Sequence, residues 1–597
     1  MRTGEGGAIE QSRANVAGAI VRIQSPPGRV AALPGPDTLD RLQAQTTAAR
    51  APDERTFPTM LAPAGRNHGA VSARPAEGWT LHRMTPPTRL YGANGLRTGA
   101  DGRIYVAQVG GSQISAVDPG SGAVEVISPM GGGITAPDDL AFDEAGNLYA
   151  TEITEGRVSV LRPNGTSAVV YGDLPVANPI TYSQGRLIAG GCEMGARVLE
   201  LDRNGGAPRV IADNVPMPNA FEVGPDGKLY MPVMGANAIW RVNMDGSGEP
   251  EVVCGDLGVP DSVKFDAEGM IVSTQVASGQ VLRIDPRTGA RTVLADIGAG
   301  LDNCTFVGER LFISHILGSI HEITTPKAAG GVVKPLIEKG LQWPLDVSMG
   351  ADGVLWIADG GFLFSLRAGE AVKLEGMLFS PGFPGYSRGV VAAGAGEMIV
   401  TTANGEVVKF HPAGPSSEVL ASGYDQLMGV ALAPSGAVVF AEYGTGKVHS
   451  VHNGQVEELA SGLDRPKGVA VAGDGTVHVA ESGAGRVVRL VGGRTETMLD
   501  DLVRPEGLAI RNGTVTVLDV KRREAIQCDL SGGAREVIAA GLPVGPPEGT
   551  DPRPLGGVGH MCGPMGNMTG LDVGPDGTVW ICGDLEGSVL ALRSRSS

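Results

Sequence analysis

The chain is poor in aromatic residues and in cysteine, and it contains no long uninterrupted apolar run. Aromatic residues make up only 4% of its 597 positions, so few side chains point to a ligand that binds by stacking. Its six cysteines form no Cys-x-x-Cys pair and no zinc-ligand spacing, and we expect them to be free thiols of a reducing compartment. No run of about 18 apolar residues occurs, which excludes a transmembrane helix.

Positive charge is also scarce. Lys and Arg total 48 against 65 Asp and Glu, a formal net charge of −17, and no basic stripe interrupts the acidity. Because phosphate binding needs clustered positive charge, we expect neither nucleic acid nor a membrane as a partner. Arg13 and Arg22 bracket the mildly apolar residues 15–23, which is not the pattern of a signal peptide. These features predict a cytoplasmic location and leave the oligomeric state open.

Glycine, in contrast, is abundant, with 91 residues dispersed along the chain. A phrase of apolar residues around an Asp-Gly-type turn runs over residues 94–108 and returns at 138–152 and beyond, about every 40 residues. Twelve copies are recognisable. Their first residues are Asn94, Asp138, Asn178, Asn219, Asp261, Asp302, Leu345, Arg388, Met428, Lys467, Glu506 and Thr569.

Each copy holds four short alternating stretches joined by glycine-containing turns. Four strands in about 40 residues are typical of one propeller blade. Twelve blades exceed the usual four to eight of one ring, so the sequence predicts an all-β protein of two tandem six-bladed β-propellers. We expect a largely irregular N-terminal segment over residues 1–76, a first propeller over 77–339 and a second over 340–597.

The last copy stops after its third strand, at Leu592. Because an unpaired strand edge is a liability, we predict that an N-terminal strand completes that ring. Residues 19–33 resemble the third and fourth strands of a blade and are the first candidate. The alternative is an irregular leader followed by a closing strand at 79–84.

The first residue of each copy directly precedes the innermost strand and is expected to face the propeller axis; we call this the axial position. In the first ring all six axial residues are Asn or Asp, whereas the second ring has Leu345, Arg388, Met428, Lys467, Glu506 and Thr569. If only the turn before the strand required Asn or Asp, these residues would occur at the axial position in both rings.

Carboxylates that converge on an axis repel one another, and a bound divalent cation resolves the conflict. Oxygen ligands favour a hard ion, so we expect Ca²⁺, with Mg²⁺, Mn²⁺ or Zn²⁺ as alternatives. The predicted ligands are Asn178, Asn219, Asp261, Asp302 and Asp138. The competing interpretation is that these Asn and Asp side chains bond only to local backbone.

The repeats, with Pro218-Asn219 and Pro260-Asp261 as examples, resemble six-bladed propellers of the SMP-30/gluconolactonase, strictosidine-synthase-like and NHL-repeat group over roughly residues 90–597. The resemblance implies an axial metal held by Glu, Asn and Asp, and Asn219 and Asp261 match the Asn and Asp. Asn178 matches a further polar position. The Glu is replaced by Asn94, so Asp138 or Asp302 is expected to supply its charge.

Other candidates lie at the ends of second strands of the first ring, on the same face. His315 and Glu152 are predicted to join Asp261 in catalysis, His315 as a general acid or base. The alternatives are a hydrogen-bonded rim histidine and a carboxylate that caps a turn. The predicted substrate-binding residues are Asn94, Asn303, Gln275 and Glu193. Cys192 is interpreted as buried rather than nucleophilic.

The second ring has a candidate pocket of its own, formed by Arg388, Lys467, Glu506 and His560. The two cationic side chains beside Glu506 are suited to a carboxylate ligand, or else to a salt-bridged plug of the channel. Long loops at 377–388 and 545–568 are candidate lids.

Together these patterns favour a metal-dependent hydrolase of an ester or lactone, acting on a small molecule at the first axis. One alternative is a lyase, an isomerase or a strictosidine-synthase-like condensing enzyme on the same scaffold. Another is a non-enzymatic, NHL-type propeller pair that binds a ligand or a protein.

Overall fold

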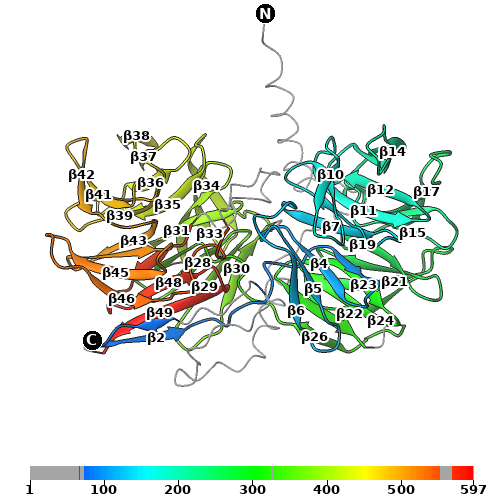
Figure 1. Ribbon diagram of the computed structural model, residues 1–597, viewed down its shortest axis with the longest axis horizontal. Helices are drawn as coiled ribbons and strands as arrows, with labels where there is room; N and C mark the ends of the chain where they lie inside the picture. The colour runs from blue at the N-terminus through cyan, green and yellow to red at the C-terminus, as the bar shows by residue number, and fades with distance from the viewer. Residues whose placement is uncertain are drawn as a thin grey trace, which may run out of the picture. The chain divides into compact units, whose positions relative to one another are not determined.

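The computed structural model describes residues 66, 73–324, 327–378, 380–394, 396–550 and 568–595. Within these ranges the protein is almost entirely β (Figure 1), with one short 3₁₀ helix, η1 (Met234–Ala236). The strands form twelve antiparallel sheets, each one blade, and in ten of them all strands pair in chain order, whereas β1 and β2 join the last two blades from the N-terminal side. The expected all-β architecture of two six-bladed propellers is confirmed. No helix in these ranges is long and apolar enough to cross a membrane.

The blades of the first ring are built from β3 (Leu96–Thr98), β4 (Ile104–Gln108), β5 (Gln113–Val117), β6 (Val124–Ser128); β7 (Pro137–Phe142), β8 (Leu148–Glu152), β9 (Arg157–Leu161), β10 (Ser167–Tyr171); β11 (Ala177–Ser183), β12 (Arg186–Gly191), β13 (Ala196–Leu201), β14 (Arg209–Val215); β15 (Glu222–Val223), β16 (Leu229–Val233), β17 (Ala238–Val242), β18 (Glu251–Cys254); β19 (Pro260–Phe265), β20 (Ile271–Gln275), β21 (Gln280–Ile284), β22 (Arg291–Asp296); β23 (Leu301–Val307), β24 (Arg310–His315), β25 (Ser319–Ile323) and β26 (Val333–Ile337).

The blades of the second ring are built from β27 (Asp346–Met349), β28 (Leu355–Asp359), β29 (Phe362–Leu366), β30 (Lys373–Met377); β31 (Ser387–Gly394), β32 (Glu397–Thr402), β33 (Glu406–His411), β34 (Ser416–Ser422); β35 (Leu427–Leu432), β36 (Val438–Glu442), β37 (Lys447–His452), β38 (Gln455–Ala460); β39 (Pro466–Val471), β40 (Val477–Glu481), β41 (Arg486–Val491), β42 (Arg494–Leu499); β43 (Pro505–Arg511), β44 (Thr514–Asp519), β45 (Glu524–Asp529), β46 (Glu536–Ala540), β1 (Arg74–Pro75); β47 (Leu571–Val573), β48 (Val579–Gly583), β49 (Ser588–Ser594) and β2 (Trp79–Arg83).

The turn between the first two strands of a blade shows why the sequence repeats. In the fifth blade, one carboxylate oxygen of Asp266 accepts the backbone N–H groups of Glu268 (2.9 Å) and Met270 (3.0 Å). Gly269 has φ +75° there, a left-handed conformation that favours glycine. The repeated Asp and Gly therefore close the hairpin from which the blade grows.

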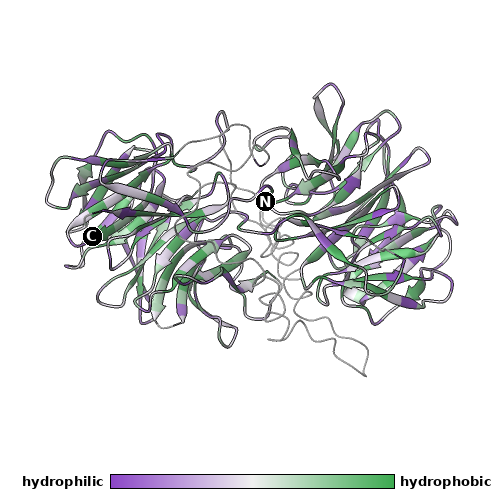
Figure 2. Ribbon diagram, turned by 90° about the horizontal axis from the view of Figure 1, so that it is seen from below, coloured by the Kyte–Doolittle hydropathy of each residue, from purple (hydrophilic) through white to green (hydrophobic). Residues whose placement is uncertain are grey.

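Neighbouring blades pack face to face through their apolar residues, which alternate with polar ones along the strands (Figure 2). Between the third and fourth blades, Ile188 and Val198 pack with Phe221, Leu229 and Met231, all with 0% exposure. Burying one such side chain contributes about 1.5–3 kcal/mol. The core is thus a series of interfaces between blades.

The second ring is closed by a strand from near the N-terminus. β2 pairs antiparallel with β49 from Trp79↔Ser594 to Arg83↔Leu590, and supplies the outer strand that the last blade lacks. The buried Arg83 guanidinium donates to Glu586 at 2.7 and 3.3 Å. The closing strand is therefore the alternative candidate at 79–84; residues 19–33 lie outside the described residues.

This closure changes the domain boundaries. The described residues 73–88 belong to the second compact unit, which resumes at Leu341, whereas the first unit spans Arg89–Gly340. The expected start of the first propeller at residue 77 is thus corrected, because residues 79–83 pair with β49. Thr88 donates its hydroxyl to the carbonyl of Leu341 at 2.8 Å, so the chain leaves and re-enters the second ring at one point. The first propeller is an insertion in the second.

Arg83→Met should destabilise the second propeller by about 3–5 kcal/mol, because it leaves Glu586 buried without its ion-pair partner. Four of the five tryptophans, Trp79, Trp343, Trp356 and Trp580, belong to that unit, so urea unfolding followed by tryptophan fluorescence reports on it. The control is Arg489→Met in the same ring, whose exposed pair with Glu496 should contribute no more than ~1 kcal/mol. Equal effects of both substitutions would contradict this role of Arg83.

Candidate functional site

The axial residues of the first ring sit at irregularities where the innermost strand begins. In four blades the register of the first two strands shifts across the axial residue: between Pro137 and Leu140, Ala177 and Ile180, Pro260 and Val263, and Leu301 and Cys304. Such a bulge adds a residue to one strand and re-aims its side chain. The same shift occurs in four blades of the second ring, at Arg388, Met428, Lys467 and Glu506.

Amide and carboxylate side chains of the first ring meet in pairs. The Asn94 amide donates to Asp302 at 3.1 Å, and the Asn219 amide donates to Asp261 at 3.0 Å. Asp138, Asn178, Asn219 and Asp261 are all at most 8% exposed. The structure therefore brings predicted ligands together at the axis, from blades far apart in the sequence.

Three of these carboxylates influence one another. Burial and the neighbouring Asp139 raise the pKa of Asp138 to about 7. Burial raises the pKa of Asp261 well above its usual value, and repulsion from Asp302 and Asp138 adds to this. The pKa of Asp302 is likewise raised, by burial and by Asp138. No Lys or Arg among the described residues opposes these three shifts.

Cys192 lies in the same environment. Its buried thiol has a pKa well above the usual value because of burial, and because Asp138, Asp261 and Asp302 repel negative charge on the sulfur. Glu193, half-buried beside it, adds to this repulsion. The thiol is therefore protonated at neutral pH, as expected of a buried rather than a nucleophilic cysteine.

A cluster of ion-paired side chains lies beyond the axial residues along the innermost strands. Arg97 donates to Glu222 at 2.9 Å, and the Lys264 ammonium stands 3.2 Å from the same carboxylate oxygen. Burial would raise the pKa of Glu222, but Lys264 and Arg97 outweigh it and lower the pKa to about 2. Asp139 faces the same two cations, which oppose the rise that burial causes in its pKa. Asn303 donates to Asp139 at 3.4 Å.

Sequence reasoning missed this cluster, although a signal was present. Arg97, Glu222 and Lys264 each lie three residues after an axial residue, at a position that faces the channel again. In the second ring the equivalent residues are mostly small: Ser348, Val391, Ala431, Ala470, Ala509 and Asp572. Comparing this second position around both rings would have revealed a charged layer in the first.

The predicted residues at the ends of second strands have a structural task. Glu152, with 0% exposure, accepts the backbone N–H of Thr135 at 2.8 Å and is paired with Arg157 at 2.6 Å. Gln275 accepts the N–H of Gly258 at 3.0 Å. Each thus caps the loop that leads to the axial residue of its own blade. The structure thus gives both side chains a capping contact, whereas the catalytic role of Glu152 and the substrate contact of Gln275 stay predictions.

His315 occupies the equivalent position in the sixth blade. It is 2% exposed, and its Nδ1 accepts the N–H of Leu317 at 3.0 Å. Burial above all, with Lys339 and His321, lowers the pKa of His315 to about 3. The imidazole is therefore neutral at neutral pH, and the catalytic role of His315 stays a prediction.

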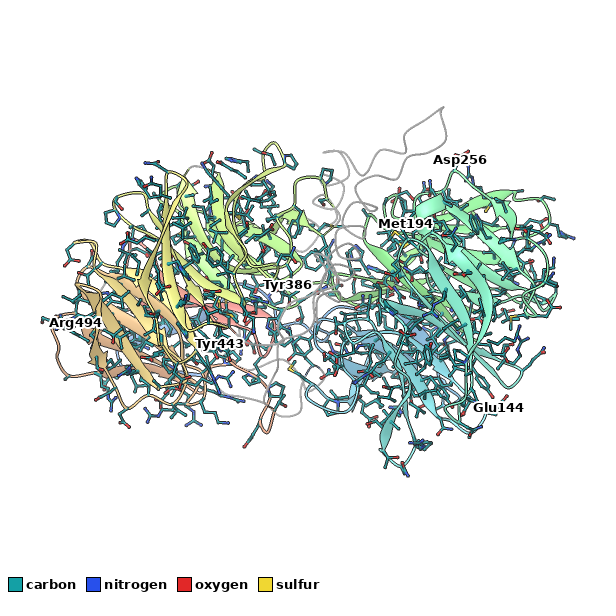
Figure 3. All side chains as sticks on the ribbon, turned by 90° about the horizontal axis from the view of Figure 1, so that it is seen from above. Glu144, Met194, Asp256, Tyr386, Tyr443 and Arg494 are labelled. Atoms are coloured by element: carbon teal, nitrogen blue, oxygen red, sulfur yellow. The ribbon has the colours of Figure 1, made fainter. Side chains whose placement is uncertain are left out.

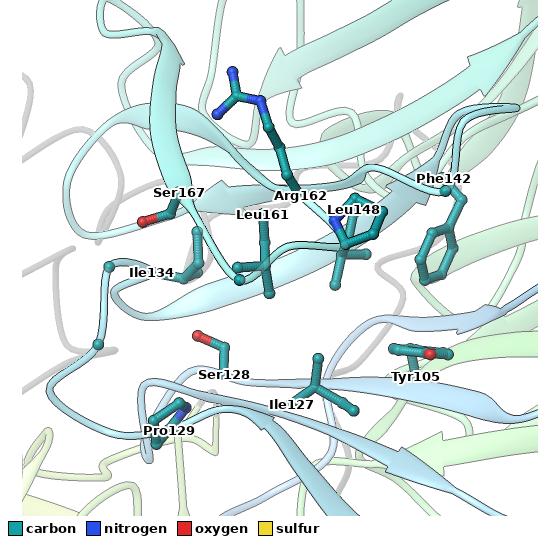
Figure 4. Close-up of a pocket in the computed structure, with 15 residues that line it drawn as sticks. Tyr105, Ile127, Ser128, Pro129, Ile134, Phe142, Leu148, Leu161, Arg162 and Ser167 are labelled. Carbon is teal, nitrogen blue, oxygen red and sulfur yellow. The ribbon is translucent and has the colours of Figure 1, made fainter.

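Of the second-ring candidates, Arg388, Lys467 and Glu506 occupy buried axial positions, and His560 lies outside the described residues. Within the described residues, no three His, Cys, Asp or Glu side chains stand close enough together to hold a metal ion. The predicted ligand set therefore depends on amide oxygens as well as carboxylates. A separate cavity of about 430 Å³ lies between the first two blades, lined by Tyr105, Ile127 and Phe142 among others (Figure 4), and it contains no axial residue.

Known proteins resemble the chain in part. Residues 181–316 match the model of the SMP-30/Gluconolactonase/LRE-like region. A gluconolactonase of Zymomonas mobilis is 26% identical over 243 residues, covering 37% of this chain and 60% of that protein. The chain therefore spans less than two thirds of this relative.

Two solved structures are similar at 18% sequence identity. A streptogramin B lyase matches with a TM-score of 0.35 over 47% of this chain and 94% of its own. A gluconolactonase from Xanthomonas campestris matches with a TM-score of 0.34 over 44% of this chain and 93% of its own. The family match lies within Arg89–Gly340, so this similarity falls on the first propeller, whereas the motifs predicted a resemblance over roughly residues 90–597.

Proposed function

We propose that the first propeller hydrolyses a lactone or a related ester at its axis, and that its carboxylates and amides hold a divalent cation there. The observation that carries the proposal is a group of three carboxylates, the buried Asp138 and Asp261 and the half-buried Asp302, whose pKa values are all raised, first by burial and then by neighbouring carboxylates. Buried charges of one sign are costly unless a counter-ion accompanies them. The gluconolactonase relative and the family match support the lactone as substrate class.

The donor set fits a hard cation. Asp261 and Asp302 would supply carboxylate oxygens, and Asn178 and Asn219 would supply amide oxygens, the ligand types that Ca²⁺ prefers. No three carboxylates of the described residues stand close enough to share one ion, so Asp138 stays outside this donor set. Asp302, which accepts a hydrogen bond from Asn94, brings the charge that Asn94 lacks relative to the family's Glu. When bound, such an ion polarises a carbonyl and lowers the pKa of water.

The chain's own residues perform the remaining tasks. Asp138, with a pKa near 7, can hold or release a proton close to neutral pH and is the proposed proton acceptor for the attacking water. The Arg97–Glu222–Lys264 cluster fills the channel next to the carboxylates. Its cations are neutralised within the cluster, so the axial carboxylates keep their affinity for a cation. The cluster thus closes the channel beside the site, and its paired cations do not neutralise the axial carboxylates.

Asp261→Ala should abolish stoichiometric metal binding and reduce lactonase activity by at least about 100-fold, because the axis loses a buried ligand. Metal content is measured by elemental analysis after calcium loading, and activity with a panel of lactones and esters in H₂¹⁸O. Asp173→Asn, at an exposed carboxylate, is the control and should change neither. Wild-type protein without stoichiometric metal would overturn the metal site, and a product without ¹⁸O would favour a lyase or an isomerase.

The carboxylates also predict an unusual dependence of stability on pH. A carboxyl group whose pKa is higher in the folded state favours folding while protonated, and this benefit is lost as pH rises through the folded value. In chelated protein, Asp138→Asn should therefore stabilise the first propeller at pH 8, with a difference that shrinks toward pH 4.

Glu222→Gln is the matched control, and should destabilise at both pH values because Arg97 and Lys264 lose their partner. Urea unfolding followed by far-UV circular dichroism, with the two variants compared at each pH, measures both effects. A destabilising Asp138→Asn at pH 8 would show that this carboxylate is compensated in the free protein.

A further inference from the structure

The second ring buries a guanidinium that has no carboxylate partner. Arg388 is 3% exposed, and one of its terminal nitrogens donates to the carbonyl of Leu427 at 3.0 Å. Its Nε is buried and makes no hydrogen bond, and no carboxylate of the described residues forms an ion pair with it. Burial lowers the pKa of Arg388 to about 10, which still leaves it charged at neutral pH. An uncompensated buried charge of this kind destabilises the free protein.

An unsatisfied acceptor accompanies this donor. Glu506 is fully buried, and its Oε1 accepts Lys467 at 2.6 Å and Arg504 at 2.8 Å, whereas its Oε2 has no partner. The hydroxyl of Thr569, also fully buried, has none either. Tyr443, labelled in Figure 3, lies under the Lys467 ammonium at 5.8 Å from the ring centroid. Lys467 and Arg504 thus share one carboxylate, and Arg388 has no carboxylate partner among the described residues.

The order of the blades places Arg388 and Glu506 across the axis from each other. Contacts between innermost strands run from β31 through β35 and β39 to β43, and return through β47 and β27 to β31. Arg388 begins β31 and Glu506 begins β43, so two blades separate them in either direction. The two groups do not meet, and both retain unused polar atoms.

An open channel adjoins them. A cavity of about 620 Å³ is lined by Val391, Ala431, Ala470 and Ala509, the small residues at the position that carries the ion cluster in the first ring, and also by the carboxylates of Asp346 and Asp572. Arg388, Glu506 and Thr569 themselves do not line it. Its lining reaches Gly429, Gly468, Gly507 and Gly570, which directly follow the axial residues Met428, Lys467, Glu506 and Thr569. This volume lies within the range of sites for small organic molecules.

We infer that the axis of the second propeller binds a small hydroxycarboxylate. The carboxylate of the ligand pairs with the Arg388 guanidinium, which is the side chain best suited to hold one. A hydroxyl of the ligand donates to Oε2 of Glu506, and a second polar atom bonds to the Thr569 hydroxyl. The carbon skeleton occupies the end of the channel lined by alanine and valine. A ligand of this class offers a hydrogen-bond partner to Nε of Arg388, to Oε2 of Glu506 and to the Thr569 hydroxyl.

The inferred ligand also has a chemical relation to the first ring. When water opens a lactone, its oxygen forms a bond to the acyl carbon, the ring C–O bond breaks, and a proton passes to the released oxygen. The product is a hydroxycarboxylate. That the second ring binds a product of the first therefore rests on the proposed function, whereas the site itself does not.

Isothermal titration calorimetry with D-gluconate, on the full chain, tests the site. Wild-type protein should bind gluconate, and gluconamide, which lacks the charge, should bind at least about tenfold more weakly. Arg388→Met should weaken gluconate binding at least about tenfold, and Thr569→Val should weaken it less. Arg494→Met, the same substitution at an exposed position of the same ring, should leave binding unchanged.

Stability supplies a second measurement. Without ligand, Arg388→Met should raise the melting temperature of the second propeller by about 2–4 °C, because it removes a buried unpaired charge. A structural arginine would show the opposite. Asp261→Asn should abolish lactone hydrolysis without affecting gluconate binding, so the two proposals fail separately. No binding of gluconate or the smaller lactate, or a destabilising Arg388→Met with normal binding, would overturn the inference.

Discussion

Closure of the second propeller requires a fourth strand for its last blade, in which β47, β48 and β49 supply only three. In the second ring this requirement is met by residues that precede the first ring in the sequence, since β2 joins β49. The closure is fixed by a buried ion pair between Arg83 and Glu586 as well as by backbone hydrogen bonds. Consequently the first propeller is inserted into the second between Thr88 and Leu341. The second ring is complete only when the strands on both sides of this insertion have been synthesised.

The same local feature presents different side chains to the channel in the two rings. The bulge at the start of the innermost strand turns the axial residue toward the channel in both, and a polar residue at the end of a second strand holds the preceding loop. Asp359, Glu442, Glu481 and Asp519 cap loops of the second ring as Glu152 and Gln275 do in the first. Because the scaffold is the same, the two rings differ mainly in the side chains at their axial positions.

The repeat and its glycines were sufficient to predict the blades and their number, since each hairpin needs the same turn chemistry. The axial residues followed from the position of the repeat on a known architecture. The roles of Glu152 and His315 could not be predicted from the sequence. A residue that caps a loop and one that contacts a substrate occupy the same place in the repeat. Only burial and hydrogen-bond partners separate them, as the saturated carboxylate of Glu152 and the neutral imidazole of His315 show.

The two channels also differ in how charge is balanced. In the first ring Arg97 and Lys264 are satisfied by Glu222 and Asp139, so the axial carboxylates are left as a separate, purely anionic layer. In the second ring mostly small residues and Asp572 replace that cluster, Lys467 and Arg504 share Glu506, and Arg388 has no carboxylate partner among the described residues. An anionic axis favours a cation and a cationic axis favours an anion. The residual charge of each ring therefore determines which class of ligand its axis is able to stabilise.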